Sequence, residues 1–298
     1  MTVGRVTVGS SSYNSIASID AASSRLAKLQ QQLSSGAAIT TPSDDPAGTV
    51  RALQIRGELS RNAQYQAAGN DAIAWLSTAD TAYSSIVTTT QQARTLVLQA
   101  LNTGANDGAS NEAIAQQIDG VRTSLIALAN TSYNGRPVFG GATANGSAYD
   151  SSGAYVGDST GTVVRGIGPS DDVSVSAVGT DVFGTQPNDL FSTLQNIANT
   201  IRTNPSAATL QSSLGDLDTA ISRVSAAQAT EGAAYQRVQL AQSTGTASAT
   251  ALKTRLSGIE DADLAELAVK VTTANTTYQA ALQTTASIGQ QSLLDFLR

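Results

Sequence analysis

Apolar and small residues recur along this chain at alternating spacings of four and three residues. The longest run comprises Ala72, Leu76, Ala79, Tyr83, Ile86, Thr90, Ala93, Val97 and Ala100. Shorter runs comprise Ile114, Ile118, Val121, Leu125 and Leu128; Leu190, Leu194, Ile197 and Ile201; and Leu210, Leu214, Leu217, Ile221 and Val224. Near the C-terminus the spacing returns at Leu264, Leu267, Val271, Ala274, Tyr278, Ala281, Thr285 and Ile288. One narrow apolar stripe per helix favours a coiled coil or a long bundle, with an ordinary globular bundle as the alternative.

The positions of proline and glycine place the ends of these helices. Residues 47–136 and 206–298 contain no proline, which is the strongest helix breaker. Both stretches are therefore expected to form long helical arms. We expect breaks at residues 102–108, at residues 203–206 and, more weakly, at residues 244–248. Ser110 or Asn111 is the expected cap of the helix that follows the first break.

The segment between the two arms has a different composition. No leucine occurs from Ala129 to Asp189, and eleven of the 25 glycines lie between Thr131 and Leu190. Valine and glycine turns favour strands, which we expect at residues 162–167 and 172–178. Asn134-Gly135 predicts a tight turn. We expect this insert to face outward as a spacer or surface domain, and its deletion to be tolerated by the arms better than the reverse deletion.

The predicted fold is mainly α with a β-rich insert: long coiled-coil or helical-bundle arms from both termini and a small central β domain. Five segments follow along the chain. They are an N-terminal assembly helix with an extended segment (1–45), a helical arm of a rod domain (46–130), the β-rich insert (131–189), the returning arm (190–260) and a C-terminal assembly helix (261–298).

The composition removes most kinds of chemistry. The chain has no cysteine and no histidine, so it lacks thiolate nucleophiles, zinc–sulfur sites and the commonest general base. Its net charge is −6 and no dense basic cluster occurs, which argues against nucleic-acid binding. No apolar stretch approaches the roughly 20 residues of a membrane span, so membrane insertion is not expected. We also expect no cleaved signal peptide, because the N-terminus has no apolar core.

No residue is nominated as catalytic, cofactor-binding or metal-binding, and no cofactor is expected. The pair Asp44-Asp45, followed by Pro46, is typical of a helix start with an aspartate cap and proline at the first helical position. Asp171-Asp172 is interpreted as a solvated turn. The acidic stretch from Glu260 to Glu266 is interpreted as a solvated helix face. An enzyme, such as a carboxylate-based hydrolase with its site in the insert, remains an alternative without a nominated pair.

Both ends of the chain carry motifs of a known family. Residues 26–57 read LAKLQQQLSSGAAITTPSDDPAGTVRALQIRG, in which a helix ends at L-S-S-G and another begins at D-D-P. Residues 261–298 read DADLAELAVKVTTANTTYQAALQTTASIGQQSLLDFLR. The two segments resemble the N-terminal motif and the C-terminal helix of the bacterial flagellin superfamily. The order of arm, variable insert and arm resembles that superfamily as well.

Further motifs resemble the superfamily member that joins the flagellar hook to the filament. They are the closing residues 292–297, the stretch NTSYNGRPVFGG at residues 130–141, and the insert segments 155–158, 172–176 and 179–183. This resemblance implies a structural, non-enzymatic and extracellular adaptor, exported without a cleaved signal through the flagellar type III apparatus. The implied partners are neighbouring copies, the first hook-associated junction protein, flagellin, and a cytoplasmic export chaperone that binds the C-terminal helix. Filament flagellin or a close paralogue that itself polymerises is the alternative.

The terminal stripes supply the candidate assembly residues. These are Leu26, Leu29, Leu33, Leu264, Leu267, Val271, Ala274, Tyr278, Ala281, Leu293, Leu294 and Phe296. If the two stripes meet only each other, they form a thin two-helix arm that is marginal alone, because helices draw most of their stability from packing. We therefore expect residues 1–45 and about 265–298 to be mobile in the isolated protein and ordered by neighbouring subunits.

Overall fold

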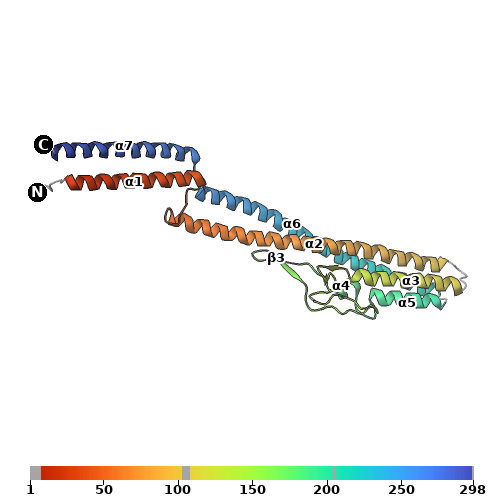
Figure 1. The fold of residues 1–298 in the computed structure, drawn as a ribbon. Helices are drawn as coiled ribbons and strands as arrows, with labels where there is room; N and C mark the ends of the chain where they lie inside the picture. Colours follow the sequence, from red (N-terminus) through yellow and green to blue (C-terminus); the bar gives the residue numbers. More distant parts are fainter. Residues whose placement is uncertain (1–7, 103–107, 204–205, 297–298) are drawn as a thin grey trace. The chain divides into compact units, whose positions relative to one another are not determined.

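The computed structural model describes residues 8–102, 108–203 and 206–296, and the side chains of residues 13–101, 108–203 and 206–287. The chain divides into two compact units: residues 1–60 with 249–298, and residues 61–248. Long helices dominate both units, and the strands lie in the second unit (Figure 1). The prediction of a mainly α fold with long arms and a small central β region is confirmed. Among the described helices, none is both long and apolar enough to cross a membrane.

The first unit pairs the two ends of the chain. Helix α1 (Val8–Ser35) packs against helix α7 (Leu264–Phe296), and Figure 1 shows the two lying side by side. Helix α2 (Pro46–Asn102) begins in this unit, and helix α6 (Ala207–Glu260) ends in it. Helix α1 ends where Gly36 takes a left-handed backbone with φ +69°, a conformation that suits glycine because it has no side chain.

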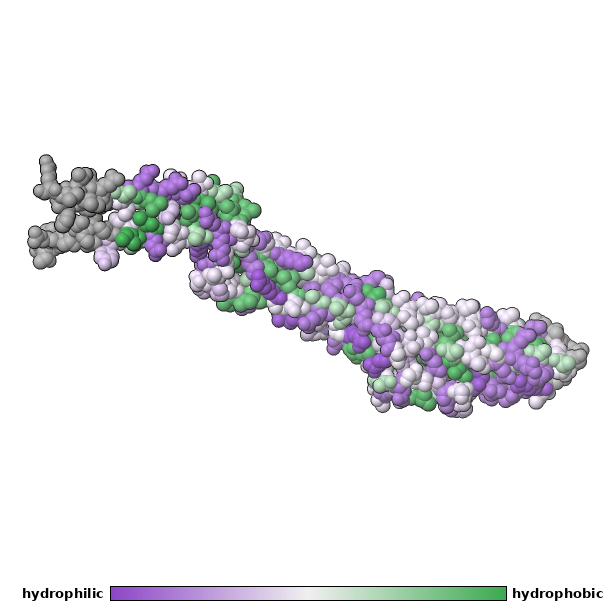
Figure 2. Space-filling model, in the orientation of Figure 1, coloured by the Kyte–Doolittle hydropathy of each residue, from purple (hydrophilic) through white to green (hydrophobic). Residues whose placement is uncertain are grey.

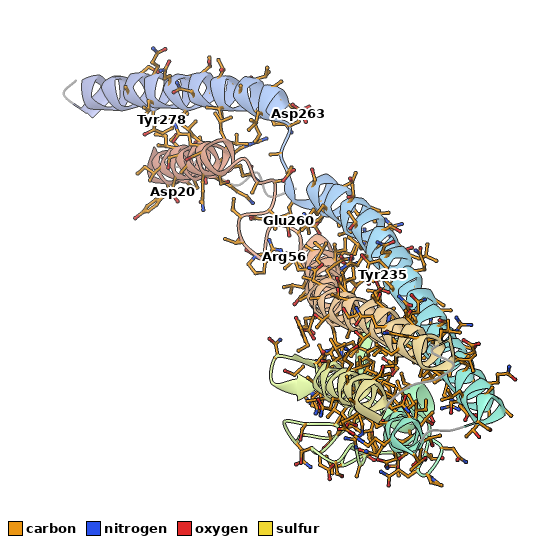
Figure 3. The ribbon with its side chains drawn as sticks, turned by 90° about the vertical axis from the view of Figure 1, so that its right-hand side faces the viewer. Asp20, Arg56, Tyr235, Glu260, Asp263 and Tyr278 are labelled. Atoms are coloured by element: carbon orange, nitrogen blue, oxygen red, sulfur yellow. The ribbon has the colours of Figure 1, made fainter. Side chains whose placement is uncertain are left out.

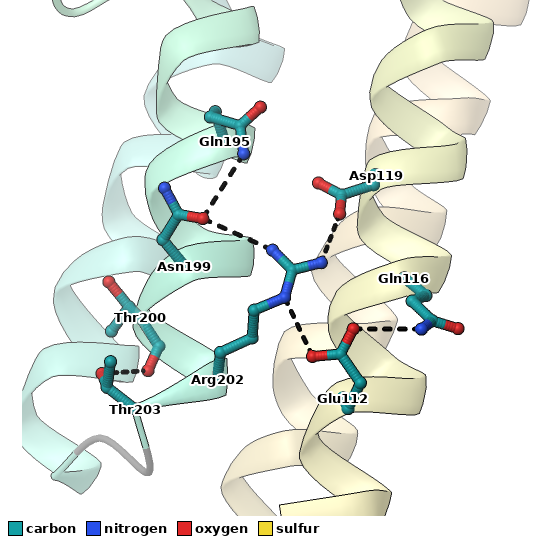
Figure 4. Close-up of polar contacts among 8 residues, drawn as sticks. All are labelled: Glu112, Gln116, Asp119, Gln195, Asn199, Thr200, Arg202 and Thr203. Carbon is teal, nitrogen blue, oxygen red and sulfur yellow. Dashed lines mark hydrogen bonds and ion pairs between the residues drawn. The ribbon is translucent and has the colours of Figure 1, made fainter.

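The second unit holds the hydrophobic core. The stripe from Ala72 to Val97 on α2 is buried, as its spacing predicts, and it meets the stripes of the other helices. Helix α3 (Gly108–Ala129) packs against α5 (Leu190–Arg202), and α6 runs antiparallel to α2. Arg202 fastens α5 to α3 by ion pairs of 3.0 Å with Glu112 and 2.5 Å with Asp119 (Figure 4).

The insert contains two antiparallel hairpins and a short helix. Strands β1 (Ser132–Tyr133) and β2 (Arg136–Pro137) flank the predicted turn, where Asn134 and Gly135 both have positive φ. Strand β3 (Val164–Gly168) pairs with β4 (Asp171–Ser174), close to the two expected strands. Strand β4 ends earlier than predicted: Val175 N–H still donates to Val163 O beside β3, but Ala177 N–H donates to Val138 O of another segment. Helix α4 (Gly179–Phe183) follows.

The insert is not a separate module: it belongs to the second unit and shares its core. Its apolar side chains lie in the same core as the helical stripes. Phe139 contacts Tyr83 of α2 edge-to-face at 5.0 Å and Phe183 at 5.4 Å. The β3 residue Arg165 forms a 2.6 Å ion pair with Asp71 and lies 5.6 Å from the ring centre of Trp75. The insert therefore covers an apolar face of the long helices.

Two expectations about helix ends are corrected. Helix α6 continues without a break through residues 244–248, and hydroxyls in and beside this stretch bond to carbonyls of the helix itself. Thr246 Oγ1 donates to Gln242 O at 2.9 Å, for example. Helix α3 already begins at Gly108, so Ser110 and Asn111 lie in its first turn and neither is the residue before the helix. The expected break after Arg202 is confirmed, with Thr203 as the residue that follows α5. The other expected break, at residues 102–108, lies largely outside the described residues.

Candidate assembly surfaces

The apolar stripes of α1 and α7 face each other. On α7 Leu267 is 7% exposed, and the stripe residues that follow it are half-buried: Val271, Ala274, Tyr278, Ala281 and Thr285. On α1 the half-buried residues include Ile19, Leu26, Leu29 and Leu33. Figure 3 shows Tyr278 on the side of α7 that faces α1. The four-and-three spacing thus places most of the described assembly candidates in one intramolecular seam.

The remaining candidates lie elsewhere. Leu264, at the first residue of α7, is 52% exposed and lies outside the seam. Leu293, Leu294 and Phe296 lie in the last turns of α7, and their side chains are outside the described residues.

The first unit has almost no core of its own. Among its described residues, the buried hydrophobic side chains are Ala52, Leu252 and Leu267. Several of its large apolar side chains are exposed: Tyr13, Ile16, Val50, Leu53, Leu264, Val269 and Leu282. Green, hydrophobic residues are visible on this part of the surface in Figure 2. A unit of α1, α7 and the adjoining ends of α2 and α6 that exposes these side chains has the pattern of an incomplete bundle.

Most of helix α7 carries no charged side chain. After Lys270 no charged residue occurs before Asp295. Its hydroxyl side chains bond to carbonyls of the same helix, as Thr272 does to Ala268 O at 2.9 Å and Thr276 to Thr272 O at 3.0 Å. Because these donors are already satisfied, another protein surface can cover them without leaving a buried donor unpaired.

The turn between α1 and α2 is organised around Asp44. Its Oδ2 accepts hydrogen bonds from the backbone N–H of Thr40 and Thr41 and from the Thr40 hydroxyl, at 2.8–3.0 Å. Lys28 Nζ lies 2.7 Å from Oδ1. The bond from Lys28, followed by the bonds from Thr41 and Thr40, holds the pKa of Asp44 well below its usual range. Asp44 therefore stabilises the turn in its ionised form.

The start of α2 is capped by the next residue. Asp45 Oδ1 accepts the backbone N–H of Gly48 at 2.9 Å, and Pro46 is the first residue of the helix. Of the two aspartates expected to cap the helix, Asp45 contacts its first turn, whereas Asp44 contacts the preceding turn.

Two connecting segments of the first unit are bonded to each other. Ala38 N–H donates to Glu260 O at 2.7 Å, and Ala262 N–H donates to Gly36 O at 2.9 Å. Arg56 and Glu260 form a 2.8 Å ion pair beside these bonds (Figure 3). An open recess of about 260 Å³ lies next to the pair, with Ile39, Pro42 and Leu53 in its walls. These contacts join the segment after the end of α1 to the segment before the start of α7.

One unusual side chain was not foreseen. Glu231 of α6 faces Tyr83 of α2, and burial raises the pKa of its carboxyl to about 8, with Asp80 as a further cause. Burial likewise raises the pKa of Tyr83. The sequence pattern contains the relevant information, because Glu231 lies seven residues from both Val224 and Val238 on the α6 stripe. A lone buried carboxyl beside a tyrosine is no catalytic pair. Within the described part of the chain, no cluster of three or more acidic side chains is placed to hold a metal ion.

Comparison with known proteins identifies the two arms. Residues 9–144 match the family model for the bacterial flagellin N-terminal helical region, and residues 214–297 match the model for the C-terminal helical region. The flagellar hook-associated protein 3 of Salmonella typhimurium is 32% identical over 132 residues, which are 44% of this chain and 41% of that protein. The chain thus matches about two fifths of that relative's length.

Two further relatives match longer stretches. The flagellin of Bacillus subtilis is 26% identical over 99% of this chain and its own full length. A solved structure of a putative flagellar hook-associated protein from Vibrio parahaemolyticus superposes with a TM-score of 0.67, covering 73% of this chain and 100% of that one at 20% identity. The models for both helical regions of one family match the two arms of this chain, in order and around the insert. The chain belongs to the bacterial flagellin family.

Proposed function

We propose that this protein is a structural adaptor of the bacterial flagellum that joins the hook side to the filament. The observation that carries the proposal is the incomplete first unit: among its described residues few hydrophobic side chains are fully buried, and several large ones are exposed. Neighbouring subunits supply the missing packing, and this packing offsets the entropy cost of ordering α1 and α7 at assembly. On α7, the exposed large hydrophobic side chains that such neighbours could cover are Leu264, Val269 and Leu282.

The adaptor role rather than the filament role rests on the relatives and the motifs. The stretch of 32% identity is to a hook-associated protein, and the match to a flagellin is 26%. The proposed partners are further copies of this chain, a first junction protein on the hook side and flagellin on the filament side. Before assembly, a cytoplasmic chaperone binds the C-terminal helix and the flagellar export apparatus carries the protein outward.

The location of the protein tests this proposal. The chain has no cysteine, so Ser225→Cys, at an exposed position of α6, gives one labelling site. We expect a thiol-reactive dye to mark a single spot at the base of each filament. Labelling along whole filaments would contradict the adaptor role.

Filament flagellin is the second candidate, and the match to a flagellin over 99% of the chain favours it. Purified protein at high concentration distinguishes the two roles. An adaptor stays in small oligomers, whereas a flagellin grows into filaments that electron microscopy detects. Long filaments of the purified protein would support the second candidate.

A further inference from the structure

The contact between α2 and α6 is polar at one end of the second unit. Asn62 Nδ2 donates to Gly245 O at 3.0 Å, and Gln66 Nε2 donates to Gln242 O at 3.0 Å. Gln242 Nε2 donates in turn to Asn70 Oδ1 at 2.7 Å. Amide side chains therefore join the two helices here, whereas apolar side chains join them from Ala72 onward.

The same short pattern occurs on both helices. Gln66 precedes Gly69 by three residues, and Gln242 precedes Gly245 by three residues. A methyl group at Gly245 would collide with Gln66 Nε2, and one at Gly69 would lie 3.2 Å from both Cγ and Nε2 of Gln242. Each glutamine thus occupies the space that the glycine of the facing helix leaves open. Because the helices are antiparallel, one spacing serves both contacts.

The apolar part of this contact repeats along the chain. Small residues recur at heptad positions on both helices: at Ala72, Ala79, Ala93 and Ala100 on α2, where Ile86 interrupts the repeat, and at Ala220, Ala227, Ala234 and Ala241 on α6. At most of these positions, displacing one helix by a heptad would replace an alanine with another alanine. The alanine repeat alone therefore discriminates poorly between alignments. A glutamine displaced from its glycine would meet a side chain instead.

We propose that the reciprocal contacts Gln66–Gly245 and Gln242–Gly69 form a register lock between α2 and α6. The lock selects the observed alignment at this end of the pair and excludes alignments displaced by one heptad. In the observed alignment the side-chain nitrogens of Gln66 and Gln242 both donate hydrogen bonds across the helix contact, and a displaced alignment would lose these bonds, which is unfavourable. This role is independent of what the protein joins.

Spin-label distances test the lock directly. Gln64→Cys and Ser243→Cys place labels at exposed positions of α2 and α6 in a chain without other thiols. The parent protein is expected to give one distance. Gln66→Leu with Gln242→Leu keeps side-chain size but removes the amides, and we expect a second population that reflects a shift of about 10 Å along the helix axis. A single, unchanged distance in the leucine variant would overturn the proposal.

Alanine substitutions give a second test that does not depend on the leucine variant. Gln117 and Gly120 on α3 have the same spacing, but a Cβ at Gly120 meets no atom within 4 Å. Gly120→Ala is expected to raise the melting temperature, because alanine favours helix over glycine. Gly245→Ala is expected to lower it, because the new methyl displaces Gln66. Equal increases in both variants would overturn the lock.

Discussion

Glu231 has a carboxyl group whose pKa is strongly raised by burial. Burial raises its pKa from 4.5 to about 8, so the folded protein retains a proton there that the unfolded chain releases. Stability is therefore greatest below pH 4.5 for this group and is lost as the pH rises through 8. We expect Glu231→Gln to remove this loss, a difference on the order of a few kcal/mol at pH 9. Urea unfolding at pH 5, 7 and 9 measures it, and Asp216→Asn at an exposed position of α6 is the control. Parallel curves for parent and Glu231→Gln would contradict the assignment.

Asp44 and Asp45 stand next to each other but stabilise different structures. Asp44→Ala removes the acceptor of Thr40, Thr41 and Lys28, so the turn between α1 and α2 should lose protection in hydrogen exchange. Asp45→Ala removes a helix cap, a loss of about 1 kcal/mol, and should affect only the first turn of α2. Because the pKa of Asp44 is lowered, its contribution is present at neutral pH and lost as acid protonates it. Identical exchange patterns in the two variants would refute the division of roles.

The stripe of α7 is the element on which assembly is expected to depend. Leu267→Asp with Val271→Asp puts two charges into the α1–α7 seam, where unpaired charge is unfavourable. We expect motility and filament attachment to be lost while the second unit stays folded. Emission of Trp75, the single tryptophan, reports that unit because its side chain is 1% exposed. Ser212→Asp with Ser225→Asp, both exposed on α6, is the matched control. Motile cells carrying the α7 variant would show that the seam is dispensable.

At this scale the sequence was most informative where a pattern is periodic. The spacing from Ala72 to Val97 predicted a buried stripe, and Asn134-Gly135 predicted its turn. The sequence around Gly245 did not reveal that Gln66, far away along the chain, fills the space beside this glycine. The burial of Phe139 against Tyr83 depends on a contact between distant segments, which local propensity does not contain. The assembly residues stay a prediction, since neighbouring subunits decide them.

At the scale of the whole molecule, the insert and the long helices form one core. Removing residues 132–178 would uncover Trp75, Tyr83 and their neighbours on α2. We expect this deletion to abolish cooperative unfolding of residues 61–248, measured by calorimetry and by Trp75 emission. Removing residues 1–35 instead should leave that transition in place, because the buried core lies in the second unit. A sharp, native-like transition after the first deletion would contradict the single core.

The uncharged stretch of α7 after Lys270 determines how an assembly contact made there responds to salt and pH. Ion pairs between exposed groups weaken as salt screens them. A contact made by methyl groups, amides and hydroxyls that already bond within their own helix has little charge to screen and no group that titrates near neutrality. Its strength should vary little from fresh water to brine. An external structure joined by such contacts would stay assembled as the salt concentration and pH of the surrounding water change.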